Sequence, residues 1–157
     1  MAVGLTTYDG VPGRSPVCGT LAPSMPYPVG LHLSLQLPTP KIRSGSMFNP
    51  TVLVTETGPS TFSMDTGRPI QAVIVRTDTR QVVGVYGGAI GGTGYLVDLS
   101  AGQSRSIPVV GGTARCDGGI GSALPVGSYQ AIAQVTPETS PHAPAYLTSP
   151  VAVRVRP

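Results

Sequence analysis

Leucine occupies every second position from residue 31 to residue 37, with His32, Ser34 and Gln36 between the leucines. A period of two places alternate side chains on opposite faces, so this stretch predicts a strand with one buried face. Alternating patterns or short apolar runs predict further strands at 51–57, 69–77, 81–87, 94–100, 104–110, 129–135 and 149–156. About eight strands separated by turn residues, with no window of helical periodicity, favour an all-β sandwich or barrel.

The first 28 residues differ from the rest of the chain in being rich in proline and glycine. Proline fixes φ and removes a backbone donor, which excludes a helix or a central strand there. We therefore predict a proline-rich N-terminal arm at 1–28 and a single β-domain at 29–157. The arm is either a loose leader or an extended segment laid on the sheet.

The composition supports a folded domain, although its low charge and high Gly and Pro content are unusual. Charged residues make up 11% of the 157 residues, and the chain holds 21 Gly and 17 Pro. Disordered chains have few apolar residues, whereas this chain is 40% hydrophobic. A chain of this length fits one domain with a core of its own.

The net charge is +3, and the basic residues form no run along the sequence. Proteins that bind nucleic acid usually concentrate positive charge on one stripe, so we expect no nucleic-acid partner. No apolar stretch is long enough for a membrane helix. The first ten residues lack the basic and apolar regions of a secretory signal. Either the protein is cytoplasmic, or a signal or anchor precedes residue 1 in the full protein.

Two cysteines, Cys18 in the arm and Cys116 in a later loop, allow one intramolecular pairing. A disulfide closing a loop of about a hundred residues would stabilise the fold by ~4–5 kcal/mol in the chain-entropy model. We expect this bridge, which would hold the arm on the domain and imply an oxidising compartment. The alternatives are two unpaired buried thiols or a catalytic thiol, but the sequence shows no electropositive niche or base for the latter.

No pattern in the sequence predicts a catalytic, cofactor or metal site. His32 and His142 are the only histidines, and neither lies at zinc-ligand spacing from other ligands. There is no G-x-S-x-G elbow, and the few acidic residues lie beside glycine or turn residues, where Asp usually stabilises a turn. We predict a protein that is not an enzyme and needs no cofactor.

The glycine-rich stretch 86–94 would be a phosphate loop only if a helix with G-K-[ST] followed it. A strand pattern follows instead, so we predict a hairpin tip. Exposed loops on rigid scaffolds often carry binding, which makes Tyr86, Ile90 and Tyr95 the candidate contact residues.

The stretch LPVGSYQAIAQV at 124–135 resembles the L-x-x-G-x-Y stretch that introduces a late strand in immunoglobulin-like and fibronectin-like sandwiches. The run 47–135, with TVLVTETG, IQAVIV, a VV strand, LSAGQS and LPVGSY in that order, resembles the bacterial intracellular proteinase inhibitor family. The resemblance implies an immunoglobulin-like β-sandwich in which Tyr129 hydrogen-bonds back to the backbone at a structural corner. Ala131 stands where antibody domains have their second core cysteine, and the chain has no Trp.

Together these patterns predict a non-enzymatic protein-binding or structural module of a bacterial secreted or cell-envelope protein. It would contact another protein, or another copy of itself, through loops or an exposed sheet edge. One alternative is a protease inhibitor acting through the loop 86–94. Another is a virion or surface-assembly component whose arm joins neighbouring copies into an oligomer. The protein is extracytoplasmic in the first case, and cytoplasmic or part of a virion if Met1 is the native start.

Overall fold

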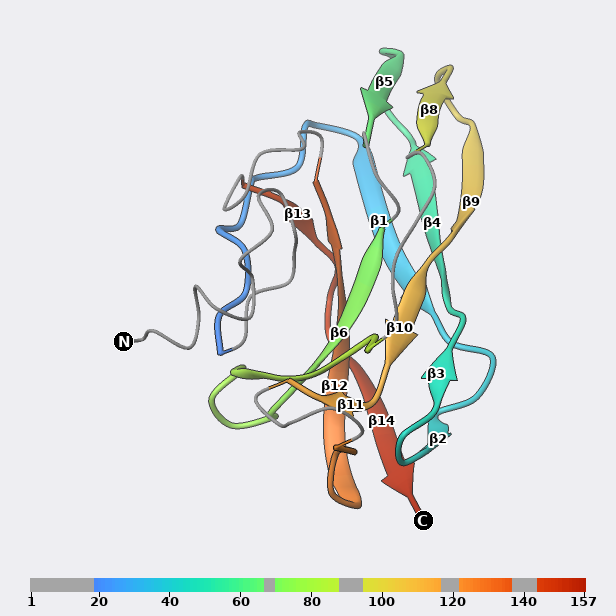
Figure 1. Ribbon diagram of the computed structural model, residues 1–157. Helices are drawn as coiled ribbons and strands as arrows, with labels where there is room; N and C mark the ends of the chain where they lie inside the picture. The colour runs from blue at the N-terminus through green and yellow to red at the C-terminus, as the bar shows by residue number, and fades with distance from the viewer. Residues whose placement is uncertain (1–18, 67–69, 88–94, 117–121, 137–143) are drawn as a thin grey trace.

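The computed structural model describes residues 19–66, 70–87, 95–116, 122–136 and 144–157, and these residues form an all-β structure with no helix. None of the described segments could therefore cross a membrane as a helix. The strands are β1 (Leu31–Gln36), β2 (Lys41–Arg43), β3 (Met47–Phe48), β4 (Thr51–Glu56), β5 (Phe62–Asp65), β6 (Gln71–Val75), β7 (Val82–Val85), β8 (Leu96–Leu99), β9 (Ser104–Pro108), β10 (Val110–Gly112), β11 (Ala114–Arg115), β12 (Gly127–Val135), β13 (Tyr146–Leu147) and β14 (Val151–Arg156). Figure 1 shows their arrangement.

A strand lies within or across each of the eight ranges that the sequence pattern predicts. The pattern missed β2, β3, β5, β10, β11 and β13, which are two to four residues long. A strand of two or three residues has too few positions on each face to show a period of two.

Three strands, in the order β1-β4-β9, form a small antiparallel sheet. Leu33 pairs with Val54 and Leu35 with Val52, and all four side chains are buried on one face. Proline at residues 38 and 40 ends β1, because proline cannot continue a hydrogen-bonded ladder. The small sheet therefore has one apolar inner face and one polar outer face.

A large mixed sheet has the order β11-β7-β6-β12-β14-β2, with β10 also paired to β6 and β13 to β12. The chain leaves the small sheet after β1 and crosses to this sheet, where β2 runs parallel to the last strand, β14. At its centre, β12 is antiparallel to both β6 and β14. This sheet contains the longest strand, the nine-residue β12, and forms the second layer.

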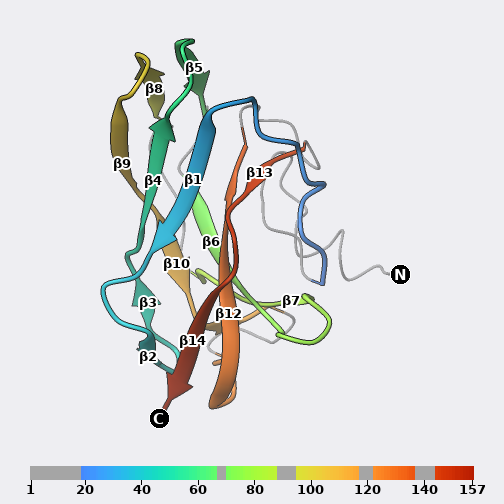
Figure 2. The ribbon, with the colours of Figure 1, turned by 180° about the vertical axis from the view of Figure 1, so that it is seen from behind.

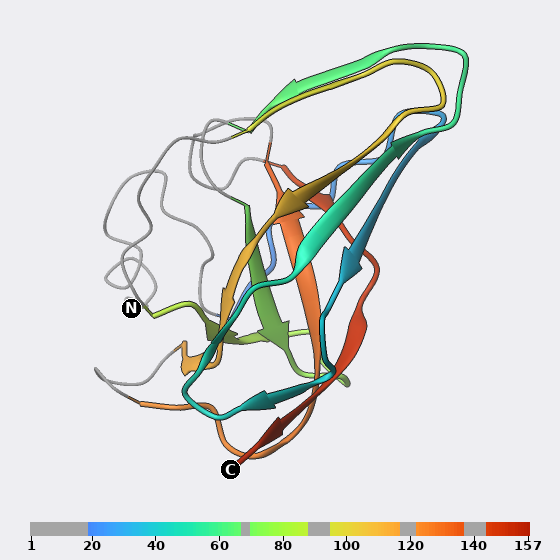
Figure 3. The same cartoon turned by 90° about the vertical axis from the view of Figure 1, so that its right-hand side faces the viewer.

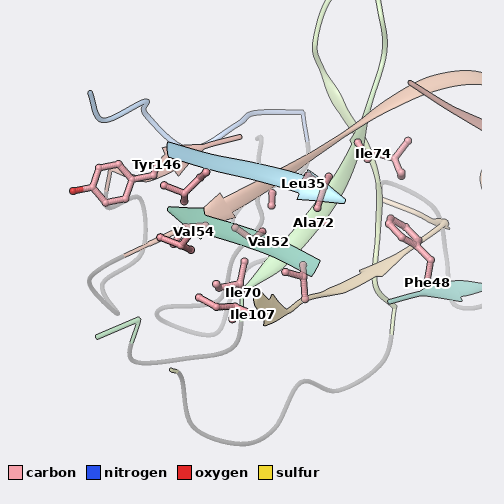
Figure 4. Close-up of a cluster of buried hydrophobic side chains, with 14 of the residues drawn as sticks. Leu35, Phe48, Val52, Val54, Ile70, Ala72, Ile74, Ile107 and Tyr146 are labelled. Atoms are coloured by element: carbon pink, nitrogen blue, oxygen red, sulfur yellow. The ribbon is translucent and has the colours of Figure 1, made fainter. Parts of the chain in front are cut away.

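The two sheets face each other across one apolar core (Figure 4). The small sheet contributes Leu35, Val52, Val54 and Ile107, among others, and the large sheet contributes residues such as Ala72. Burial of apolar area at roughly 25 cal/mol per Å² makes this interface the main stabilising term.

The two layers are joined along one side. The ladder of β4 with β9 continues into that of β3 with β10, across a hydrogen bond from Val109 N–H to Pro50 C=O of 3.0 Å. Beyond the other end of the small sheet, β5 and β8 form a two-stranded ribbon, which Figure 3 shows turning sharply away from β4 and β9. The opposite side of the two-layered structure, at β1 and β2, has no such joining ladder among the described residues.

The described part of the arm lies along the large sheet, beside β13 in Figure 2. Gly19 N–H donates to Val82 C=O at 3.0 Å. Met25 N–H donates to Ala145 C=O, and Ala145 N–H donates to Pro23 C=O, both at 2.8 Å. Residues 19–28 of the arm thus form a segment laid on the sheet and held by its own backbone hydrogen bonds, in addition to any disulfide.

Side chains fasten the arm as well. Ala22 N–H donates to Gln134 Oε1 at 2.7 Å, and Tyr27 Oη donates to Leu147 C=O at 2.6 Å. Leu21 packs on a second apolar cluster on the outer face of the large sheet, which comprises Val73, Val75, Val82, Val85, Cys116 and Ile132. The inner faces of β6 and β12 lie in the core, and the arm helps to bury their outer faces. The sequence pattern for 129–135 predicted one buried face.

Candidate functional site

The predicted contact loop has flanks in two different sheets, and Ile90 lies outside the described residues. Tyr86 follows β7 in the large sheet and is half-buried. Tyr95 is also half-buried and precedes β8, where its N–H donates to Thr66 Oγ1 at 2.7 Å and its C=O accepts from Thr66 N–H at 3.0 Å. The backbone of Tyr95 thus belongs to the ribbon, and its role as a contact residue stays a prediction.

Cys116 is buried in the second apolar cluster, and its N–H donates to Val83 C=O at 2.9 Å. Cys18 lies outside the described residues, so the disulfide stays a prediction. Gly19, which follows Cys18, is hydrogen-bonded to Val82, the residue before Val83. The backbone at residue 19 and the backbone of Cys116 therefore meet neighbouring positions of β7, which agrees with a bridge between the two cysteines.

Tyr129 lies near the start of β12, and its hydroxyl donates to Pro125 C=O at 2.8 Å. The acceptor is four residues upstream in the turn that precedes the strand. This is the backbone contact that the resemblance to immunoglobulin-like sandwiches implies for Tyr129. The hydrogen bond joins the Tyr129 side chain to this turn, and its role as a structural corner stays a prediction.

The described residues contain no group of three or more His, Cys, Asp and Glu side chains that could hold a metal ion. Glu56, the buried acid of this part of the chain, accepts a hydrogen bond from Gly58 N–H at 2.8 Å. That contact stabilises the turn after β4. The carboxylate thus has a structural partner within its own turn.

The structure reveals a candidate binding site at β1 that the sequence could not locate. Thr57 N–H donates to Gly30 C=O, and Glu56 uses its own N–H and C=O toward Gln103 and Gly102. Because antiparallel residues alternate in the direction of their backbone groups, Leu31, Leu33 and Leu35 direct theirs away from β4. Within the described residues, β1 pairs with β4 alone. In Figure 2, β9, β4 and β1 lie in this order from left to right, so that β1 is the strand of the small sheet farthest from β9.

This open edge is six residues long and holds neither proline nor charge. Leu33 and Leu35 each present an N–H and a C=O, and no hydrogen bond takes these groups up among the described residues. Beside them, His32, Ser34 and Gln36 are exposed on the outer face. An unprotected edge with free backbone groups is a template for an added strand.

The other edge of the small sheet, β9, differs in chemistry. It contains Pro108, which has no N–H to donate, and the charged Arg105. Proline and charge on an edge are common protections against pairing with another chain. The contrast singles out β1 as the unpaired edge of this sheet that holds neither proline nor charge.

No family model matches the sequence, and no curated protein matches it. Among solved structures, a β-glucosidase of Erythrobacter marinus is 13% identical, with a TM-score of 0.47, over 92% of this chain and 16% of that one. A β-glucosidase of Listeria innocua in complex with glucose is 10% identical, with a TM-score of 0.44, over 92% and 17%. The chain thus spans less than a fifth of either enzyme. Similarities at this level carry no conclusion about its fold or activity.

Proposed function

We propose that the chain is an immunoglobulin-like β-sandwich with a non-enzymatic, protein-binding or structural role in a bacterial secreted or cell-envelope protein. The open edge of β1 carries the proposal. There a partner would add an extended strand, using main-chain hydrogen bonds to Leu33 and Leu35 for affinity. The extracytoplasmic location rests on the predicted disulfide.

Three features support the immunoglobulin-like assignment. The first part of the domain is split, so that β1 pairs with β4 in one sheet and β2 pairs in parallel with β14 in the other. The strands β6, β12 and β14 are neighbours, as strands C, F and G are in that fold. Tyr129 makes its corner hydrogen bond near the start of β12.

The alternatives receive less support from the contacts. The inhibitor hypothesis depends on residues 86–94, of which 88–94 lie outside the described residues. The assembly hypothesis depends on an arm that reaches neighbouring copies, but the described part of the arm is bonded to its own sheet. No observation favours either of them over strand addition at β1.

The test is a selection of binders from a displayed peptide library, followed by amide hydrogen exchange on the complexes. We expect the Leu33 and Leu35 amides to become protected on binding, because they would donate to the added strand. The His32 and Ser34 amides face β4 and should change little. Peptides that protect only other segments would contradict the proposal.

A pair of matched variants sharpens this experiment. Ser34→Lys puts a charge on the open edge, and Ser106→Lys puts the same charge on β9 in the same cross-strand row, on the far side of Leu53. Lysine on an edge opposes strand addition, so S34K should weaken binding about tenfold or more while S106K leaves it unchanged. Equal effects of the two variants would speak against β1 as the binding edge.

A further inference from the structure

The structure gathers four cations that are dispersed in the sequence. Lys41 pairs with Arg154 and Arg43 with Arg156 across the parallel strands β2 and β14. All four side chains are exposed, and the intervening Ile42 and the flanking valines of β14 are buried. The four cations therefore share the outer face of these two strands, which lie side by side near the C-terminus in Figure 2. We call them the basic face.

Register gives the basic face a defined spacing. Neighbouring strands lie about 4.8 Å apart, and alternate residues of a strand repeat at about 6.6 Å. The four cations thus occupy the corners of a small rectangle. Along β12, Ser128 continues the row of Arg154, whose Nη1 donates to Ser128 Oγ at 3.1 Å. The position of Val126, one residue before β12, continues the row of Arg156.

Within the described residues, none of the four cations forms an ion pair with an Asp or Glu side chain. Arg154 bonds to Ser128, and Arg156 Nη1 bonds to the C=O of Pro157 at 3.3 Å. Four like charges this close repel one another. An anionic partner would relieve that repulsion, and it would be bound more strongly at low salt because exposed charges are screened.

We propose that the basic face binds an acidic, extended segment of a partner protein. Carboxylates at alternate positions of an extended chain share one face and repeat at the same ~6.6 Å as the cations of β2 and β14. Three of the four cations are arginines, whose planar guanidinium groups pair with carboxylates through two parallel hydrogen bonds. Arginine is also enriched at protein interfaces, where lysine is depleted.

The surroundings favour this partner over other polyanions. The positions that share this face along β12 and β14 are Val126, Ser128, Gln130 and Ala152, so no aromatic ring is available to stack nucleic-acid bases. Stable attachment to a bilayer would need larger apolar side chains to insert beside the charges, and Val126 is the exposed apolar residue there.

Side chains, not the backbone of β2, would make the contact. Lys41 N–H is already bonded to Thr39 Oγ1 at 3.2 Å. Arg43 C=O already accepts from Ser46 N–H at 3.0 Å and Thr113 Oγ1 at 3.2 Å. The basic face is therefore separate in residues and in chemistry from the open edge of β1, and either site can fail its test without the other.

The test uses fluorescence anisotropy with two labelled peptides of equal composition. One alternates Thr and Asp, and the other carries the same aspartates in a single block. We expect the full chain to bind the alternating peptide more tightly, with affinity that falls as salt increases. Equal binding of the two peptides would contradict the spacing argument.

Matched double variants locate the binding. R154Q/R156Q removes two cations of the basic face, and R76Q/R80Q removes two exposed cations at the turn between β6 and β7, with the same change in net charge. Each exposed ion pair contributes up to ~1 kcal/mol to binding. R154Q/R156Q should therefore bind the alternating peptide about tenfold more weakly than the unmodified chain. R76Q/R80Q should bind it as tightly as the unmodified chain. Equal losses in the two variants would overturn the proposal.

Competition identifies the class of partner. A single-stranded oligonucleotide of equal charge, and vesicles with about one-third phosphatidylserine, are titrated against the bound peptide. We expect both to compete only weakly. Tighter binding of the oligonucleotide or of the vesicles than of the alternating peptide would replace the acidic segment by nucleic acid or by a membrane surface.

Discussion

Gly19 and Cys116, almost a hundred residues apart, donate their backbone N–H groups to consecutive carbonyls of β7, those of Val82 and Val83. Because residue 18 precedes Gly19 directly, we predict that Cys18 and Cys116 form a disulfide. The oxidised protein should gain no mass on alkylation unless it is first reduced. The double variant C18S/C116S should lose about 2–5 kcal/mol of unfolding free energy, with the chain-entropy figure at the upper end of that range.

The reduced unmodified chain is the control for that variant, and both should unfold at the same denaturant concentration. Rapid alkylation of both thiols in the native, unreduced protein would contradict the pairing. The arm should remain attached in the double variant, because its hydrogen bonds to Ala145, Gln134 and Leu147 do not depend on sulfur.

Tyr129→Phe removes the hydroxyl that donates to Pro125 C=O. We expect a loss of about 1 kcal/mol of unfolding free energy, the usual net contribution of one hydrogen bond. Urea denaturation measures it. Tyr95→Phe is the matched control, since the Tyr95 hydroxyl makes no hydrogen bond to the described residues. Equal losses in the two variants would show that the corner contact adds nothing to stability.

Gly112→Ala tests the close approach of β10 to the end of β7. A Cβ at residue 112 would lie 2.7 Å from Tyr86 Cα and 2.8 Å from Val85 O, and these backbone atoms cannot swing aside. Forcing extra atoms into a packed site costs about 1–3 kcal/mol, which thermal unfolding should register. At Gly127 the nearest atom would be 3.5 Å away, so Gly127→Ala should change stability little. Similar melting temperatures for both variants would rule out the proposed steric conflict.

Because of Tyr27, we expect the stability of the protein to fall with rising pH in the alkaline range. Burial raises the pKa of the Tyr27 hydroxyl above its ordinary value of 10.0, and the hydroxyl donates to Leu147 C=O. The unfolded chain therefore releases this proton at lower pH than the folded chain. The contribution of Tyr27 to the free energy of unfolding is fully present below pH 10. It is lost as the pH rises through the pKa that the hydroxyl has in the folded state.

The measurement is the unfolding free energy of the unmodified chain and of Tyr27→Phe as a function of pH. Near neutral pH the variant should be about 1 kcal/mol less stable, because it lacks the hydrogen bond. Above pH 10 the difference should shrink. A difference that stays constant up to pH 11 would mean that Tyr27 does not titrate with unfolding.

The strand pattern was predictable where alternation was long enough to read, as in β1 and β14. The buried outer face of β12 was not predictable from its own residues. Ile132 and Gln134 lie on that outer face, and the arm that covers it comes from more than a hundred residues earlier in the chain. Burial of this kind depends on a tertiary contact, which local periodicity does not encode.

The two candidate binding surfaces also could not be predicted from the sequence, for two reasons. An open edge is a property of sheet order, and the pattern of β1 is the same whether or not a strand lies beside it. The basic face depends on the parallel pairing of β2 with β14, and β2 is too short to be predicted as a strand. The arginines are therefore dispersed in the sequence and come together only through the register of β2 with β14.

The way the arm covers the large sheet limits how this protein can be shortened for laboratory work. A fragment that starts at residue 29, where the composition changes, would uncover the strip formed by Val73, Val75 and Ile132. Such a fragment should be prone to aggregate, because a bare apolar strip on a sheet favours association between molecules. A fragment that keeps this strip covered therefore includes residues 19–28, and expression trials should retain them.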